Sequence, residues 1–246
     1  SGSDGIRENN RRYDVFGNLV GELDGEASAL LPGLTPSEID DLYATRGMRH
    51  VYDALDRRIE SIDAEGNKTW YFYDASGQQT YLVRGVADAQ GVQNAWGEVV
   101  ETRYTAFGQV RDTTAYTGRI AIGVPGDRAS ASAAIQVLAY AAQTDSRAQF
   151  VYDRRGLVTQ RVDAEGAVVS ITYNAFGDAL QVLSDIGGGG TARTTASYDR
   201  RGSKTAQTED ADALARAQSW NYDAFGRLVS AVDGNGHTTV FGYDRL

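Results

Sequence analysis

A short motif, Tyr-Asp-x-x-Gly, recurs along the whole of this 246-residue chain and constrains its fold more than any other feature. The shortest spacing between consecutive copies is 21 residues, and it occurs three times. A chain that repeats one unit folds as a stack, because a single unit cannot bury its apolar face alone. A ninth repeat begins at Tyr243 and is cut off. The eight repeats before it begin at Tyr13, Tyr52, Tyr73, Tyr104, Tyr152, Tyr173, Tyr198 and Tyr222.

We expect residues 13–246 to form one repeat domain, preceded by a tag or tail at 1–12. The longer spacings are explained by insertions into the 21-residue unit. These insertions are placed at about 25–45, 85–97, 118–145 and 186–190.

Each repeat is predicted to contain tight turns. The Asp side chain at the first turn position accepts hydrogen bonds from the following backbone N–H groups, and Gly takes the left-handed last position. The residues predicted to form these turns are Tyr52, Asp53, Asp63, Gly66, Tyr152, Asp153, Gly156, Asp163, Gly166, Tyr222, Asp223, Gly226, Asp233 and Gly236.

Several units depart from the pattern. Asp56 stands where Gly is expected, and Thr105 and Asn174 replace the turn Asp. In the units that begin at Tyr73 and Tyr104, we expect no second Asp-x-x-Gly, so their hairpins should use different turns.

The segments between the turns are typical of β-strands. Residues 69–73, 169–173 and 239–243 are rich in β-branched and aromatic side chains. Period-2 patterning that keeps its register through a period of 21 indicates stacked antiparallel hairpins. One column of the sheet would then hold Tyr71, Ile171 and Phe241, and the next Tyr73, Tyr173 and Tyr243. We interpret these Tyr columns as core ladders along the sheet.

Two insertions are expected to contain helices. Thr35 as N-cap, Pro36 at the first helical position and Glu38 three residues after the cap form a capping box, followed by about ten helical residues. The Ala-rich stretch 129–142 favours a helix slightly, although residues 135–138 are also compatible with a strand. Residues 187–190, all glycine, are expected to form a flexible loop.

The composition excludes several functions. There is no cysteine, so disulfides, thiol nucleophiles and Cys-ligated metals are ruled out. The net charge of −9 argues against nucleic acid, whose binding needs clustered Lys and Arg. No apolar run is long enough to span a bilayer.

Candidate sites are few, and we predict no catalytic, cofactor-binding or metal-ligating residue. Rows of Asp can bind Ca²⁺, but each turn offers one Asp where a calcium loop concentrates several oxygen ligands. A cation or catalytic site is also the weaker interpretation of the acidic residues near the predicted helix, Glu38, Asp40 and Asp41.

The remaining candidates are histidines and tryptophans. His50 and His237 are expected to face solvent, since no H-E-x-x-H or G-x-S-x-G motif surrounds them. The aromatic residues could instead form a sugar-stacking platform that includes Trp70, Trp96 and Trp220.

The repeat resembles the YD-repeat (RHS) family. The match is complete from Tyr222 to Gly236. The segment begins with Tyr-Asp-x-x-Gly-Arg-Leu, and a second turn, Asp-x-x-Gly, begins eleven residues after the Tyr. Similar repeats build the shells of bacterial Rhs polymorphic toxins, toxin-complex B and C subunits, and teneurins. The resemblance implies an all-β fold in which antiparallel hairpins stack into a curved strip or spiral, here part of a shell, with one or two short inserted helices.

The resemblance also implies a function. We expect a non-catalytic structural segment of a secreted or surface shell, bacterial in origin, that encloses or displays a toxin or other domain. Its partners would be neighbouring repeats of a longer chain and an enclosed C-terminal domain. Edge-to-edge self-association is a further possibility, since open sheet edges invite it. The alternative is an adhesion module that binds a carbohydrate or a protein receptor.

Overall fold

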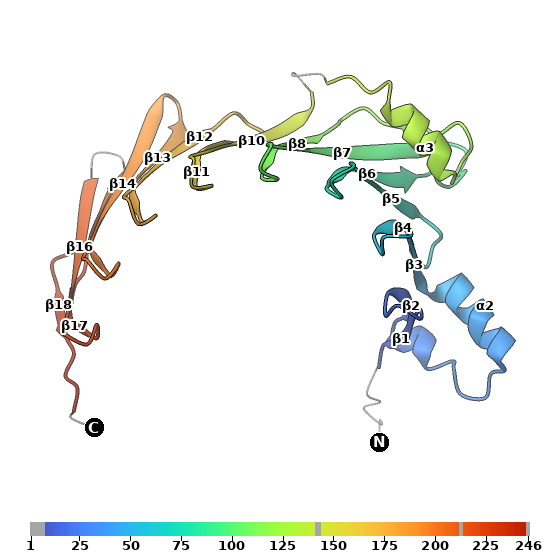
Figure 1. Ribbon diagram of the computed structural model, residues 1–246, viewed down its shortest axis with the longest axis horizontal. Coiled ribbons are helices and arrows are strands. Elements are labelled where there is room, and N and C mark those ends of the chain that lie inside the picture. Colours follow the sequence, from blue (N-terminus) through green and yellow to red (C-terminus); the bar gives the residue numbers. More distant parts are fainter. Residues whose placement is uncertain (1–7, 141–143, 212–213, 245–246) are drawn as a thin grey trace. The chain divides into compact units, whose positions relative to one another are not determined.

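The computed structural model describes residues 8–140, 144–211 and 214–244, and its strands follow one another through hairpin turns (Figure 1). The all-β fold class of antiparallel hairpin repeats with short inserted helices is confirmed. Residues 1–7 of the predicted tail, and Ala142 of the Ala-rich stretch, lie outside the described residues. The chain divides into two compact units, residues 1–103 with 113–146, and residues 104–112 with 147–246.

Unit 1 contains an antiparallel ladder in which consecutive strands pair, from β1 with β2 through β6 with β7. The short strand β9 pairs with the beginning of β7. The strands are β1 (Asn10–Tyr13), β2 (Leu19–Leu23), β3 (Met48–Tyr52), β4 (Arg58–Ile62), β5 (Lys68–Tyr73), β6 (Gln79–Val86), β7 (Trp96–Tyr104) and β9 (Ile120–Ala121). Strand β8 (Val110–Ala115) begins in unit 2 and ends in unit 1.

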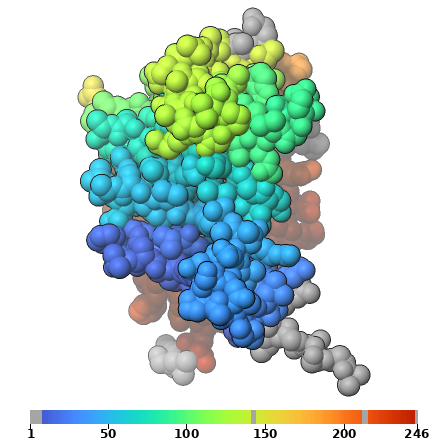
Figure 2. Space-filling view, turned by 90° about the vertical axis from the view of Figure 1, so that its right-hand side faces the viewer, coloured from blue at the N-terminus to red at the C-terminus, as the bar shows by residue number. Residues whose placement is uncertain are grey.

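Three helices belong to unit 1: α1 (Gly25–Ser28), α2 (Pro36–Arg46) and α3 (Arg128–Ile135). Figure 2 looks onto the face of this unit from which the α2 segment (light blue) and the α3 segment (yellow-green) stand out. Helix α2 has the predicted capping box, in which Thr35 and Glu38 each bond the other's backbone N–H. The Ala-rich stretch is helical only through Ile135, so the helical alternative is correct for 129–135, while residues 136–140 are neither helix nor strand. Helix α1 was not predicted.

The buried core of unit 1 is completed by an insertion. Trp70, Val83 and Val99 come from neighbouring strands β5, β6 and β7 and pair across them. The insertion after residue 117 adds the other four buried members of the cluster: Ile120, Ile122, Ala131 and Ile135. A smaller cluster forms where α1 and α2 cover β2, from Leu23, Ala27, Leu42 and Tyr43. Both clusters therefore depend on inserted segments.

The position of the larger cluster corrects one expectation. Because side chains alternate across a strand, Trp70 and Tyr71 lie on opposite faces of β5. Tyr71 and Tyr73, which belong to the two adjacent predicted columns, are thus on the face away from the unit 1 core, and both tyrosines are only half-buried. They are not core residues.

Unit 2 is a ladder in which each strand pairs antiparallel with the next, from β10 to β18. Its strands are β10 (Ser146–Tyr152), β11 (Val158–Val162), β12 (Val168–Tyr173), β13 (Ala179–Gly187), β14 (Gly190–Tyr198), β15 (Lys204–Ala211), β16 (Leu214–Tyr222), β17 (Leu228–Val232) and β18 (Thr238–Val240). Among its described residues, no hydrophobic side chain is fully buried. Strand pairing and contacts between repeats must therefore supply much of its stability.

Two further expectations about turns are wrong. Residues 187–190 do not interrupt the strands, because Gly187 pairs with Gly190 and only two residues with positive φ connect β13 to β14. Such a turn matches the twist of the flanking strands. The Tyr73 unit does contain a second Asp-x-x-Gly turn, from Asp88 to Gly91, because longer strands displace it from the expected position.

Candidate functional site

The Tyr-Asp turn is the repeated structural site of this chain, and its bonds are local. In the last repeat, the Gly226 N–H donates to the Asp223 carbonyl at 3.0 Å, and the Asp223 N–H donates to the Arg227 carbonyl at 2.9 Å. One Asp223 carboxylate oxygen accepts the N–H groups of Phe225 and Arg227, each at 2.9 Å. Gly226 has φ +81°, and the strand register shifts at Tyr222. A turn followed by a G1 bulge has these features.

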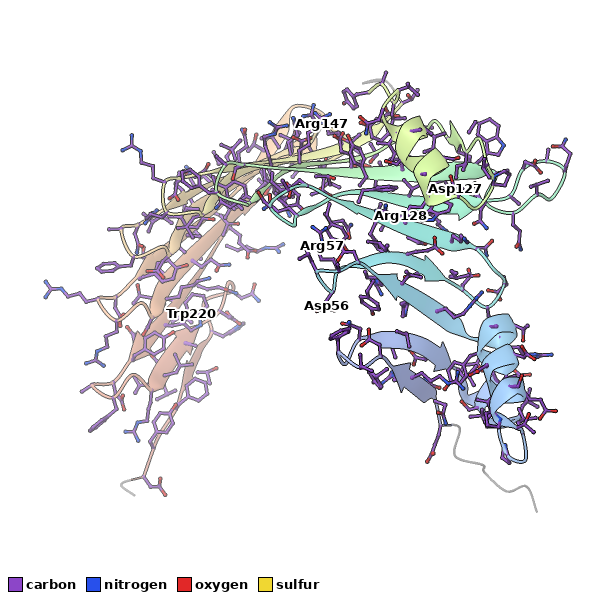
Figure 3. All side chains as sticks on the ribbon, turned by 45° about the vertical axis from the view of Figure 1, so that its right-hand side comes forward. Asp56, Arg57, Asp127, Arg128, Arg147 and Trp220 are labelled. Carbon is purple, nitrogen blue, oxygen red and sulfur yellow. The ribbon has the colours of Figure 1, made fainter. Side chains whose placement is uncertain are left out.

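The variant units keep the same bonds with different atoms. The Thr105 hydroxyl accepts the N–H groups of Phe107 and Gln109, at 3.2 and 3.3 Å. The Asn174 side-chain oxygen accepts the equivalent pair in its own turn. Asp56 takes the left-handed position with φ +57°, which is strained for a residue with a Cβ atom (Figure 3).

The second turns are built in the same way. In the turns that begin at Asp63, Asp163 and Asp233, the Gly N–H donates to the Asp carbonyl at 3.0–3.1 Å. Backbone hydrogen bonds from His237 and Asn235 lower the pKa of Asp233. A carboxylate that is held in this way stays ionised as an acceptor, which is its role in the turn.

Tyrosine hydroxyls connect consecutive repeats. In seven repeats the Tyr hydroxyl donates to the backbone carbonyl of the residue six positions after the Tyr of the preceding repeat. The pairs are Tyr52 to Leu19, Tyr73 to Arg58, Tyr152 to Val110, Tyr173 to Val158, Tyr198 to Ala179, Tyr222 to Lys204 and Tyr243 to Leu228, at 2.7–3.2 Å. The Asp thus closes its own turn, while the Tyr joins its repeat to the one before it.

The Arg that follows the left-handed turn position, Gly226 in one unit and Asp56 in another, extends this connection in two of the 21-residue units. The Arg227 guanidinium bonds the Asp223 carboxylate at 2.7 Å and lies 4.5 Å from the ring centre of Tyr243 in the next repeat. Arg57 makes the same two contacts with Asp53 and Tyr73. Tyr-Asp-x-x-Gly-Arg is therefore one physical unit, since each polar member contacts another.

Sequence reasoning missed a buried carboxylate in unit 1. The Glu101 side chain on β7 accepts hydrogen bonds from the hydroxyls of Tyr81 and Tyr116, at 2.8 and 2.7 Å, and from Arg103 at 2.9 Å. Burial alone would raise the pKa of Glu101, but these donors outweigh it and lower the pKa. Burial and Glu101 raise the pKa of Tyr81 to about 12. No motif could have shown this cluster, because its members are far apart in sequence.

A second buried carboxylate, Asp112, lies in unit 2 against two arginines. Arg111 reaches it at 2.7 Å and Arg147 at 3.3 Å. Burial opposes ionisation, yet the two guanidinium groups lower the pKa of Asp112 overall. Glu101 is held by three donors, an arrangement that stabilises a fold, whereas Oδ1 of Asp112 makes the ion pair with Arg147 without a hydrogen bond.

The predicted histidines differ in their surroundings. His237 is exposed and pairs with Asp233 at 3.1 Å, as expected for a residue that faces solvent. His50 is not exposed: its ring is buried on β3, and Nδ1 lies 2.9 Å from the Ser61 hydroxyl. Burial, and then the nearby Arg58, lower the pKa of His50.

The acidic candidates at α2 have structural partners. Glu38 belongs to the capping box, and Asp40 pairs with Arg12 at 2.6 Å. Among the residues that the structure describes, no group of three or more His, Asp or Glu side chains is arranged to hold a metal ion. No described helix is long and apolar enough to cross a membrane.

The three tryptophans have different surroundings. Trp70 is fully buried, and its indole N–H donates to Glu60 at 2.8 Å. Trp220 lies half-buried on β16 in unit 2. Trp96 is 37% exposed at the edge of an open hollow of about 760 Å³ in unit 1, where Glu98 and Arg119 form an ion pair at 2.7 Å.

The match to a known family lies in the last repeat. Residues 222–246 match the family described as RHS Repeat. The resemblance that the sequence indicated is confirmed, and the other repeats share the turn bonds of the matched one.

The solved structures with some similarity to this chain are much longer. One is the crystal structure of TcdB2-TccC3-TEV, with 13% identity, a TM-score of 0.32 and coverage of 92% of this chain. Another is the Photorhabdus luminescens Tc holotoxin pore, with 12% identity, the same TM-score and the same coverage. This chain spans 14% of the length of each. No curated protein sequence matches it.

Proposed function

We propose that this chain is a non-catalytic structural segment of a secreted or surface shell made of RHS repeats, which encloses or displays another domain. The tyrosine bridge is the observation that supports this role best. The repeats that begin at Tyr173 and Tyr198 each donate a hydroxyl to the repeat before them, and each has a carbonyl that accepts a hydroxyl from the repeat after it. The motif residues serve stacking, and a stack can be extended by further repeats in either direction.

The partners in this proposal are neighbouring repeats of a longer parent chain and a domain that the repeats enclose. Protease protection of that domain in the parent protein tests enclosure. We expect the carried domain to be cut slowly in the native protein and faster in a Tyr173→Phe, Tyr198→Phe double variant, whose bridges are lost. Equal, rapid cleavage of the domain in both proteins would overturn enclosure.

A second candidate function, carbohydrate binding, is favoured by the hollow beside Trp96. Its half-exposed indole offers a stacking surface, and the Glu98–Arg119 pair supplies polar groups next to it. A glycan array with the purified chain tests this function. A hit that Trp96→Ala abolishes, and that Trp220→Ala leaves unchanged, would favour an adhesion module. Absence of any hit would favour the scaffold.

A further inference from the structure

Aromatic side chains at the turn tips are strongly exposed in unit 2. Phe107, Phe176 and Phe225 occupy the same position of their turns and are 91%, 86% and 85% exposed. Single exposed hydrophobic residues are ordinary, but the same exposure at one repeated position forms a row. The turns between them carry arginine pairs, so the order along the unit is Phe107, Arg154 with Arg155, Phe176, Arg200 with Arg201, and Phe225.

These turns lie on one edge of the sheet. They follow alternate strands of the ladder, and in Figure 1 the turns after β10, β12, β14 and β16 project on the same side of unit 2. The Thr105–Gly108 turn is joined to the next turn by a hydrogen bond from the Gln109 side chain to the Gly156 carbonyl, at 3.2 Å. Phe and Arg-Arg tips therefore alternate between neighbours.

The two arginines of each pair have different surroundings. Arg155 bonds Asp153 and donates to the Asn174 carbonyl of the next turn at 2.7 Å, and Arg201 reaches the Asp223 carbonyl in the same way. Arg154 and Arg200 are exposed, and neither guanidinium has a hydrogen bond or ion pair to any residue in the described part of the chain. In a chain of net charge −9, they are local positive groups open to a ligand.

A hollow lies between the first Phe tip and the first arginine pair. Its volume is about 700 Å³, and its lining is Phe107, Gln109, Asp153, Arg154, Arg155 and Gly156. The Asp153 carboxylate is already used by Arg155 and by backbone N–H groups of its own turn. An apolar wall thus faces a guanidinium with no internal partner, which suits a ligand that carries an apolar group beside a carboxylate.

The spacing of the tips restricts the shape of that ligand. Tips on one edge are two strands apart, or about 9.6 Å at ~4.8 Å per strand. A polypeptide in the polyproline II conformation advances about 9.3 Å in three residues, so every third side chain would face a successive tip. A ligand that matches the row has apolar and acidic residues alternating at intervals of three.

We propose that the turn tips of unit 2 bind an extended acidic and apolar polypeptide, whose apolar residues contact Phe107 and Phe176 and whose carboxylates pair with Arg154 and Arg200. This goes beyond the structural role above and does not depend on it. The surface is formed by the turns themselves, so the stack could stand without binding anything.

Binding of a designed peptide to the 246-residue chain tests the proposal. The probe repeats Leu-Pro-Pro-Glu-Pro-Pro twice and ends on Leu, with a fluorophore for anisotropy. We expect saturable binding that weakens at least about fivefold in Arg154→Ala and in Phe107→Ser, since each removes one contact. A peptide with Lys in place of Glu should not bind.

The control is Phe16→Ser, which removes an equally placed turn-tip Phe in unit 1, where the next turn has Ala54 and Leu55 at its tip instead of an arginine pair. It should leave the affinity unchanged. No binding of the probe, or an equal loss in Phe16→Ser, would overturn the proposal. Tight binding of heparin without binding of the peptide would also overturn it, because the row of turn tips would then recognise polyanions. Unchanged circular dichroism shows that each variant is folded, and Arg200→Ala gives a second, independent loss.

Discussion

A single hydroxyl on Tyr173 joins two repeats, because it donates to the Val158 carbonyl at 2.8 Å. At the scale of residues, the members of the motif have different structural roles. Asp and Gly shape the turn through bonds within five residues, and Tyr reaches back to the preceding repeat. The motif is thus a turn and an inter-repeat contact at once.

Tyr173→Phe should lower the free energy of unfolding by about 1 kcal/mol, since one hydrogen bond is lost and the ring remains. Urea denaturation measures the change. Tyr13→Phe is the matched control, because Tyr13 begins the first repeat and is 58% exposed. Equal losses in the two variants would show that the bridge contributes nothing.

Gly226→Ala should destabilise the chain by about 1–2 kcal/mol, because φ +81° is unfavourable for a residue with a Cβ atom. No atom lies within 4 Å of the added Cβ, so the loss would come from the backbone alone. Gly118→Ala, also in open space but without a positive φ, should be neutral or stabilising. An unchanged melting temperature in Gly226→Ala would contradict the left-handed assignment.

At the scale of elements, β7 carries one glutamate on an exposed face and another on a buried face. Glu98 and Glu101 point to opposite faces, and their side chains are 41% and 8% exposed. Glu98 makes a surface ion pair with Arg119, and such pairs contribute little. Glu101 accepts three hydrogen bonds inside the unit, where each hydrogen bond contributes more to stability than at the surface.

Glu101→Gln should cost about 2–3 kcal/mol at pH 7, because a charged acceptor is lost and a buried donor is introduced. Glu98→Gln, on the same strand, should cost less than about 1 kcal/mol. Denaturant unfolding of the two variants measures both values. A loss in Glu98→Gln as large as that in Glu101→Gln would contradict the role of burial.

The same carboxylate predicts a pH dependence. The pKa of Glu101 is lowered in the folded chain, so its contribution to stability is fully present above the ordinary Glu pKa of about 4.3 and is lost as the pH falls below it. The stability difference between the native chain and Glu101→Gln should therefore shrink between pH 5 and the folded-state pKa, as shown by unfolding at several pH values. A difference that stays constant down to about pH 3 would count against an ionised Glu101.

At the scale of the whole molecule, the two units are stabilised differently. Unit 1 has two buried clusters that insertions complete, whereas the described part of unit 2 has strand pairing and tyrosine bridges without a fully buried hydrophobic side chain. In stacked repeats each unit contacts its neighbours, so stability is local.

Trp70→Ala should cost about 3–5 kcal/mol within unit 1, because a fully buried side chain leaves a cavity. Hydrogen exchange measures where this loss is felt. The amides of β5, β6 and β7 should exchange faster, while those of β13 and β14 keep their rates. Acceleration throughout the chain would show that it unfolds as a single cooperative domain.

Sequence alone predicted the period, the positions of most turns, the antiparallel hairpins and the capped helix α2. These features depend on bonds that close within a few residues, such as Asp223 with Gly226, so local residue types are sufficient. The Asp88 turn was missed because longer strands moved it out of the expected frame.

Only the tertiary structure decided which face of the sheet is buried. Trp70 becomes fully buried because Ile120 and Ile135 pack in the same cluster. They lie 50 and 65 residues after Trp70, and no repeat pattern encodes that contact. His50 and Glu101 are also buried, and no motif marks them. The hydrogen bonds of the turns depend on residues that are close in sequence. The burial of Trp70 depends instead on a distant segment that packs in its cluster, and here that segment is an insertion.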